Sequence, residues 1–130
     1  MPDGSRRGPF ALDLRPGGGA DGWASGFDRR RLRALRRGEI DPDLEVDLHG
    51  LRSGEAQRVV RSALAEAIAT RSRCVLIVHG RGTRSESGAV LRAALPEWLA
   101  EEPHAAAILA FAAAEGRHHG ATYVLLRRVR

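Results

Sequence analysis

The pattern of hydrophobic and polar positions predicts alternating strands and helices in the middle of the chain. Apolar and acidic residues alternate from Leu44 to Leu48, which is typical of a strand. From Ser53 to Thr70 apolar residues recur every three or four positions, which predicts an amphipathic helix with Ser53 as its N-cap. The run from Cys74 to Val78 is apolar and rich in β-branched residues, as expected of a strand buried on both faces.

The same alternation continues to the end of the chain. A Gly- and Ser-containing loop leads to a second amphipathic helix, which Pro96 is expected to kink or restart. Residues 106–112 are predicted to form a third strand, residues 116–120 a turn, and residues 122–127 a fourth strand. Strand-helix-strand units imply right-handed crossovers. The sequence therefore predicts an α/β fold over residues 44–130 of order βαβαββ, with three parallel strands and an antiparallel final strand.

The start of the chain has a different character. Residues 1–27 hold Gly8-Pro9 and the run from Pro16 to Gly19, which disfavour regular structure. We therefore predict a flexible Gly/Pro-rich N-terminal arm. Its apolar residues are expected to dock on their own domain rather than on a partner: Phe10, Leu12, Leu14, Trp23 and Phe27.

Residues 28–43 are predicted to form a short basic helix and a connector. Asp28 is placed to cap the helix, Leu32 and Leu35 share one face, and Gly38 is expected to end it. The other faces carry Arg29, Arg30, Arg31, Arg33, Arg36 and Arg37. Two interpretations of these arginines stay open: a solvated helix face, or an electrostatic contact with a phosphate backbone.

Composition adds a positive charge to this picture. The formal net charge is +5, the isoelectric point is about 11, and all 21 basic residues are arginines. A guanidinium matches phosphate oxygens in a bidentate manner, whereas a lysine offers a point charge. A GC-rich coding sequence explains the preference for Arg equally well. With either origin, the net positive field attracts polyanions.

The single cysteine and the apolar segments bear on the cell compartment. Cys74 has no partner for an intrachain disulfide and fits a reducing compartment. Its place at the head of an apolar run predicts an inert core thiol rather than a nucleophile. The chain starts without an apolar signal segment, and its longest apolar stretch, Ala105 to Ala114, is too short to span a bilayer. We expect a cytoplasmic protein with no membrane partner.

Three polar motifs directly follow predicted strands. They are Asp47-Leu48-His49-Gly50, His79-Gly80-Arg81-Gly82 and Gly116-Arg117-His118-His119-Gly120. Taken singly, they have structural interpretations: a hydrogen-bonded pair, an exposed turn and a hairpin tip. The carboxyl ends of parallel strands, however, meet at the edge where open α/β sheets bind ligands. The sequence therefore predicts one functional cleft that holds four of the five histidines, all but His104.

Phosphate is the occupant that this cleft is predicted to favour. The first two motifs lead toward helix N-termini, where free backbone N–H groups and the helix dipole stabilise an anion. Glycines also let a phosphate approach the backbone closely. The glycines concerned are Gly50, Gly80, Gly82 and Gly120.

These motifs carry a family resemblance. The Asp-Leu-His-Gly segment before a helix, the His-Gly-x-Gly loop and the Gly-containing turn before a Val-Leu-Leu strand resemble, in the same order, those of the Smr (small MutS-related) domain. The resemblance covers roughly Asp28 to Arg130, including the Arg-rich helix that many stand-alone bacterial members have. It implies a two-layer α/β sandwich similar to the C-terminal domain of translation initiation factor three. Arg117 and His118 stand where many members have a Gly-Gly pair, so that turn is expected to shape the cleft differently.

The resemblance also implies a function. It implies nucleic-acid binding and, in several members, endonuclease activity on RNA or DNA, including messenger RNA on stalled ribosomes. The Asp-x-His site of the family maps to Asp47 and His49, and its Gly-x-Gly loop maps to Gly80, Arg81 and Gly82. RNA, DNA and the ribosome are therefore the candidate partners.

Two cleavage mechanisms follow as hypotheses. For RNA, His49 would act as base or acid, with Asp47 orienting it or acting as a carboxylate partner and His79 as the second titrating group. Arg81, with the amides of Gly80 and Gly82, would hold the phosphate. The same phosphate site would include Arg117, His118, His119 and Gly120.

DNA lacks the 2′-hydroxyl, so cleavage would need an activated water. Asp47 with a divalent cation, Mg or Mn, would be the agent. Few carboxylates lie at the predicted edge, so the sequence assigns no dedicated metal site, and zinc is disfavoured because the only cysteine lies elsewhere. A module of the same fold that binds RNA, DNA or the ribosome without catalysis is the alternative function.

Overall fold

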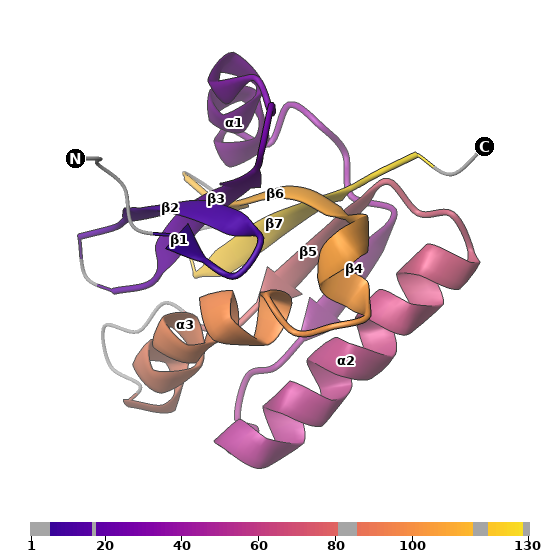
Figure 1. The fold of residues 1–130 in the computed structure, drawn as a ribbon. Coiled ribbons are helices and arrows are strands. Elements are labelled where there is room, and N and C mark those ends of the chain that lie inside the picture. The colour runs from indigo at the N-terminus through magenta and orange to yellow at the C-terminus, as the bar shows by residue number, and fades with distance from the viewer. Residues whose placement is uncertain (1–5, 17, 81–85, 116–119, 129–130) are drawn as a thin grey trace.

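The computed structural model describes residues 6–16, 18–80, 86–115 and 120–128, and it places seven strands in one sheet (Figure 1). The strands are ordered β1-β2-β3-β6-β7-β5-β4 across this sheet. Their bounds are β1 Arg6–Arg7, β2 Phe10–Leu14, β3 Ala20–Ala24, β4 Leu44–Asp47, β5 Cys74–Val78, β6 Ile108–Ala113 and β7 Ala121–Leu126. The helices are α1 Arg29–Arg36, α2 Ser53–Ala69 and α3 Glu86–Leu99, with a short 3-10 helix η1 at His104–Ala107.

The predicted βαβαββ order and the α/β class are confirmed, but the last strand takes a different place. β4 and β5 pair in parallel, whereas β7 pairs antiparallel with both β5 and β6. β6 therefore points the same way as β4 and β5, with β7 between β5 and β6. β4 and β5 are adjacent, but β6 is separated from them, because β7 lies between β5 and β6.

The prediction of an irregular N-terminal arm is wrong for the segment from Arg6 to Ala24. β2 and β3 form an antiparallel hairpin, and β3 pairs with β6 through Gly22 and Trp23. Phe10 is fully buried and packs edge-on against Phe111 with the ring centroids 5.3 Å apart. Gly8 and Pro9 form the turn between β1 and β2, and Gly18 and Gly19 directly precede β3. The apolar side chains of the hairpin drive it onto the sheet.

The docking predicted for the apolar residues of this segment is confirmed for four of the five. Phe10 and Leu12 belong to the buried core, and Trp23 and Phe27 pack against it. Leu14 is the exception, since it remains 75% exposed.

Helices cover both faces of the sheet. α2 and α3 pack on one face, over a core that includes Val60, Leu64 and Leu95. The sheet and these helices form the two layers of the predicted sandwich. On the other face, Leu32 and Leu35 of α1 pack against Leu76 of β5 and other residues of the central strands.

The basic helix α1 forms as predicted. The Asp28 carboxylate caps it by accepting a hydrogen bond from the backbone N–H of Arg30 at 2.9 Å. Two of its arginines lie over aromatic rings: Arg29 is 4.7 Å from the ring centroid of Trp23 and Arg31 is 5.0 Å from that of Phe27. Cation–π contacts of this kind hold the helix against the segment before it.

Two details of the other helices differ from the prediction. Ser53 is the first residue of α2 rather than its N-cap, because Arg52 takes that position and its backbone N–H donates to the Glu55 carboxylate at 3.1 Å. α3 continues through Pro96 to Leu99 without a restart, since a proline in the last turn removes only one helical hydrogen bond. No helix within the described ranges is long and apolar enough to cross a membrane.

Candidate functional site

The strand ends meet at one edge, as the sequence predicted. In the sheet register Asp47 lies opposite Val78, and Val78 lies opposite Ala121. Ala113, at the end of β6, lies opposite Thr122. The residues that follow β4, β5 and β6 and those that precede β7 therefore share this edge. With neighbouring strands about 4.8 Å apart, Asp47 and Ala121 are separated by about 10 Å.

The Asp47-Leu48-His49-Gly50 turn is anchored by its apolar residue. Leu48 is fully buried, and its backbone N–H donates to the Val78 carbonyl at 2.7 Å. Asp47 and His49, on either side of it, are exposed. The Asp47 carboxylate accepts a hydrogen bond from the backbone N–H of His49 at 2.9 Å. This bond fixes the turn, so Asp47 positions the backbone that carries the exposed imidazole.

His79 occupies a different environment from His49. It is 2% exposed. Its Nε2 is hydrogen-bonded to the Thr122 hydroxyl at 3.0 Å, and its Nδ1 lies 3.2 Å from the Gly80 carbonyl oxygen. With both ring nitrogens engaged inside the protein, this imidazole is a fixed part of the wall of the site. Its predicted role as a second titrating group stays a prediction.

Gly120 joins two of the predicted motifs. Its carbonyl oxygen accepts hydrogen bonds from the backbone N–H groups of His79 and Gly80, both at 3.0 Å. Gly120 has φ +93° and Gly80 has φ +104°, values that favour glycine. Gly50 also has a positive φ, and no atom lies within 4 Å of a Cβ built on it. The backbone at Gly50 is therefore open to an approaching group, as a phosphate site requires.

Five of the predicted site residues lie outside the described part of the chain. They are Arg81, Gly82, Arg117, His118 and His119. Their predicted contacts with phosphate stay predictions. Across the ranges that the structure does describe, no group of three or more His, Cys, Asp or Glu side chains is arranged to hold a metal ion.

A hollow of about 270 Å³ opens at this edge, and it brings in two arginines that the sequence did not single out. His79 and Gly120 line it together with Arg15 from the β2–β3 turn and Arg92 from α3. The carboxylate-bearing Glu115 also lines it. Arg15 belongs to the segment taken for a flexible arm, so no local pattern could have assigned it to the site.

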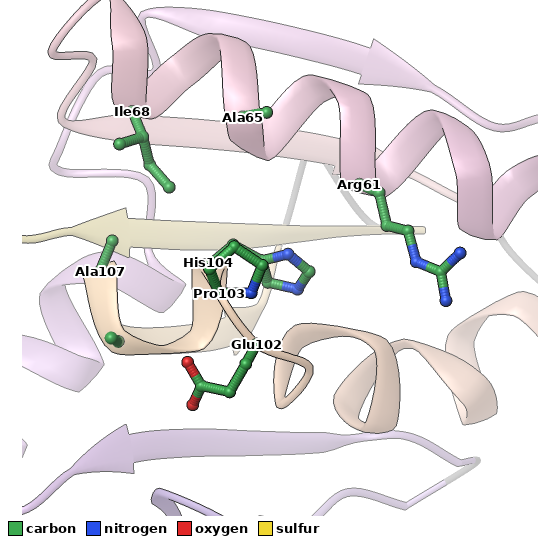
Figure 2. A pocket seen from close by; sticks show the side chains of 8 residues that line it. Arg61, Ala65, Ile68, Glu102, Pro103, His104 and Ala107 are labelled. Atoms are coloured by element: carbon green, nitrogen blue, oxygen red, sulfur yellow. The ribbon is translucent and has the colours of Figure 1, made fainter.

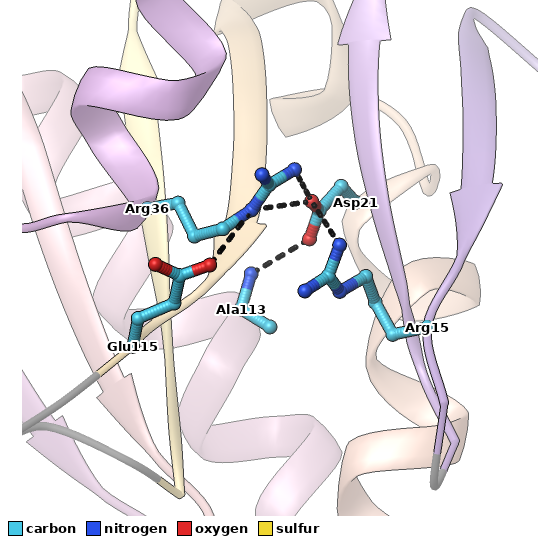
Figure 3. Close-up of polar contacts among 5 residues, drawn as sticks. All are labelled: Arg15, Asp21, Arg36, Ala113 and Glu115. Atoms are coloured by element: carbon cyan, nitrogen blue, oxygen red, sulfur yellow. Dashed lines mark hydrogen bonds and ion pairs between the residues drawn. The ribbon is translucent and has the colours of Figure 1, made fainter.

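Arg15 is held at this hollow by an ionic network around the buried Asp21 (Figure 3). Asp21 on β3 is fully buried, and Nη1 of Arg15 lies 3.7 Å from its carboxylate. The same carboxylate accepts from Nε of Arg36 at 3.1 Å and from the backbone N–H of Ala113 at 2.8 Å. Arg36 also lies 3.8 Å from Glu115. The network links the hairpin, α1 and β6 behind the hollow.

The remaining unusual residues lie away from this edge. Burial raises the pKa of the Cys74 thiol to about 12, and the side chain is fully buried, which confirms an inert core thiol. His104, the histidine that the sequence placed apart, is buried and hydrogen-bonded through Nε2 to the Trp98 carbonyl at 2.7 Å.

His104 lines a second hollow, about 560 Å³ in volume, between α2 and η1 (Figure 2). Ala65 and Ile68 of α2 face Pro103 and Ala107 across it (Figure 2). This hollow has a mainly apolar lining. Arg61, His104 and Glu102 are the polar residues in its lining, so basic side chains are fewer here and a carboxylate accompanies them.

The fold and the site define a class: an α/β domain with exposed Asp and His side chains and glycine-rich turns at the carboxyl ends of its parallel strands. The family model of the Smr domain matches residues 46–127. The chain belongs to the Smr domain family, which confirms the resemblance.

The chain is similar to curated proteins along part of its length. It is 36% identical over 78 residues to the ribosome rescue factor SmrB of Shewanella oneidensis and to that of Shewanella strain ANA-3. Each match covers 60% of this chain and 42% of the relative. The chain thus spans less than half the length of these curated relatives.

Two solved structures share the fold. The stand-alone small MutS-related protein YdaL of Escherichia coli is 28% identical, with a TM-score of 0.66 over 83% of this chain and 82% of that one. The Smr domain of Thermus thermophilus MutS2 is 37% identical, with a TM-score of 0.54 over 64% of this chain and 96% of that one. The match to YdaL covers more of the chain than the family model, which spans residues 46–127.

Proposed function

We propose that the chain binds nucleic acid through its phosphate backbone at the strand-end edge and cleaves phosphodiester bonds there. The observation that carries this proposal is that Asp47, His49 and the hollow lined by Arg15 and Arg92 lie at the same strand-end edge of the sheet. Guanidinium groups and exposed backbone N–H groups bind phosphate, and an exposed imidazole transfers protons near neutral pH.

For RNA the chemistry starts at the ribose 2′-hydroxyl. His49 accepts the proton of the 2′-hydroxyl, and the 2′-oxygen attacks phosphorus. The bond from phosphorus to the 5′-oxygen breaks, and the 5′-oxygen takes a proton from a general acid. Arg15 and Arg92, which line the hollow along the same edge, bind further phosphates of the backbone and hold the strand in place. Asp47 acts as a positioning residue through the backbone N–H of His49, and His79 holds the wall of the hollow through Thr122.

The cellular setting is part of the same proposal. The Shewanella relatives are named ribosome rescue factors. We propose that RNA associated with ribosomes, in the cytoplasm, is the natural substrate of this chain. A binding module without catalysis is a second candidate, favoured by the engagement of the Asp47 carboxylate with backbone rather than with the imidazole.

A double substitution separates cleavage from binding. Asp47→Ala with His49→Ala is compared with Glu45→Ala, an exposed carboxylate on the same strand. The substrates are labelled single-stranded RNA and supercoiled plasmid DNA, each with and without a chelator. We expect the double variant to cut at least about a hundredfold more slowly, the usual contribution of a proton-transfer group, and Glu45→Ala to cut normally.

Binding of the same RNA by the double variant completes the test. Cleavage by the double variant at the unmutated rate would contradict the enzyme proposal at this site. If neither protein cuts but both bind, the non-catalytic module is the function. Affinity that stays constant between low and moderate salt would contradict the proposed contact with phosphates.

A further inference from the structure

A second group of arginines lies at the opposite edge of the sheet from the candidate site. A hollow of about 280 Å³ is lined there by Arg71, Ser72, Arg73, Arg127 and Arg128. Residues 71–73 precede β5, and residues 127–128 follow β7. Since β5 and β7 are antiparallel neighbours, the start of one and the end of the other share an edge. We call these five residues the far-edge hollow.

Backbone hydrogen bonds hold the two segments of the far-edge hollow together. The backbone N–H of Leu126 donates to the Arg73 carbonyl at 2.8 Å, and that of Arg127 donates to the Ala107 carbonyl at 2.7 Å. The carboxyl ends of α2 and β7 lie on the same side of the molecule, away from the start of α3 (Figure 1). The far-edge hollow thus forms because β5 and β7 are neighbours in the sheet.

The charges at this hollow are not balanced by nearby carboxylates. Within residues 6–16, 18–80, 86–115 and 120–128, none of its four guanidinium groups forms an ion pair with a carboxylate. Asp43 lies at this edge, but its carboxylate accepts from the backbone N–H groups of Arg73 and Cys74. Within the described residues, these four guanidinium groups thus have no carboxylate partner at ion-pair distance.

The usual structural uses of arginine account for part of this group. Arg71 follows the carboxyl end of α2, where one positive charge complements the helix dipole. Arg127 donates from Nε to the Ala106 carbonyl at 2.9 Å, which uses one of the five donors of its guanidinium. The helix dipole and the Ala106 carbonyl account for Arg71 and for one donor of Arg127, but not for Arg73 and Arg128. An anion with several phosphates would supply oxygens for the remaining guanidinium donors.

We propose that the far-edge hollow is a second binding site for the phosphate backbone of nucleic acid, separate from the site at the strand ends. β5 has five residues, and at about 3.3 Å per residue the two edges lie about 15 Å apart. Phosphates recur about every 3.4 Å along a duplex strand, so a strand of about five nucleotides is long enough to span that distance. The inference rests on the proposed function for its ligand, and it predicts a two-point contact.

Residue-resolved NMR tests where a nucleic acid binds. A short oligothymidylate, which lacks the 2′-hydroxyl, is added to the full chain, and inorganic phosphate is added in a parallel titration at equal ionic strength. We expect the oligonucleotide to shift the amide signals of residues 71–73 and 127–128 as well as those of residues 47–50. Phosphate alone is expected to shift them far less at the same concentration.

A matched pair of substitutions tests the energetic contribution. Arg71→Gln removes one charge from the far-edge hollow, and Arg58→Gln removes one charge from an exposed position on α2 outside it. The slope of log K against log salt is expected to become about 0.7 to 0.9 shallower for Arg71→Gln and to stay nearly unchanged for Arg58→Gln. Thermal unfolding of both variants shows whether either change affects the fold.

The outcomes separate this inference from the proposed function. Shifts at residues 47–50 alone, or equal slopes for the two variants, would overturn the second site and leave the proposed function standing. Shifts at neither edge would overturn both. Equal responses of residues 71–73 to phosphate and to the oligonucleotide would show a small-anion site and overturn the nucleic-acid assignment.

Discussion

At the scale of single residues, Asp21 joins segments that lie far apart in the chain. Its buried carboxylate binds two arginines and a backbone N–H from three different parts of the chain. Removing one partner of a buried ionic group leaves the others without compensation in a medium of low polarity, which costs far more than an exposed ion pair contributes.

Asp21→Ala is therefore expected to lower the free energy of unfolding by about 3 to 5 kcal/mol, measured by urea denaturation. Asp13→Ala on the neighbouring strand is the control, because that side chain is exposed, and its effect is expected to stay within about 0.5 kcal/mol. Equal effects of the two substitutions would show that the network around Asp21 adds no stability.

At the scale of elements, the contact between β3 and β6 depends on the absence of a side chain. Gly22 pairs with Phe111, and a Cβ on Gly22 would lie 2.6 Å from Cε2 of that ring. The phenyl ring therefore fills the space that any other residue at position 22 would need. Because Phe111 is fully buried and packs against Phe10, it has little room to move away.

Gly22→Ala is expected to destabilise the protein by about 1 to 3 kcal/mol, through overpacking at this contact. Gly54→Ala is the matched change in α2, where the nearest atom to the new Cβ is 4.0 Å away, and it is expected to stabilise by about 0.5 to 1 kcal/mol. Thermal unfolding of both variants gives the signs. A neutral Gly22→Ala would indicate that the hairpin shifts on the sheet without loss.

At the scale of the whole molecule, the N-terminal hairpin belongs to the same sheet as the region matched by the Smr family model. It covers the edge of β6, contributes Phe10 and Leu12 to the core, and places Arg15 at the candidate site. The family model begins at residue 46, so this part of the fold and of the site lies outside it.

A chain that begins at Asp28 is accordingly expected to be much less stable than the full chain. The loss of two buried apolar side chains alone amounts to about 3 to 6 kcal/mol, and the uncovered edge of β6 favours aggregation. Urea unfolding and light scattering measure the two effects, with a chain lacking only residues 1–5 as the control. A shortened chain that is as stable as the control would show that the hairpin is dispensable.

The sequence by itself determined the identity and order of most elements. The α/β class, the helix capped by Asp28, the strand from Cys74 to Val78 and the shared edge of the strand ends all follow from patterns among consecutive residues. Local periodicity reports which face of an element is buried, and three motif-bearing strands that run the same way end at the same edge. For these features the sequence was sufficient.

Only the tertiary structure decided which segments become neighbours. The insertion of β7 between β5 and β6, the docking of the β2–β3 hairpin, and the arrival of Arg15 and Arg92 at the hollow depend on burial between segments far apart in the chain. The far-edge hollow arose in the same way. Apolar burial is non-directional, so no pattern along the sequence specifies which strand edge a hairpin will cover or which distant arginines will meet.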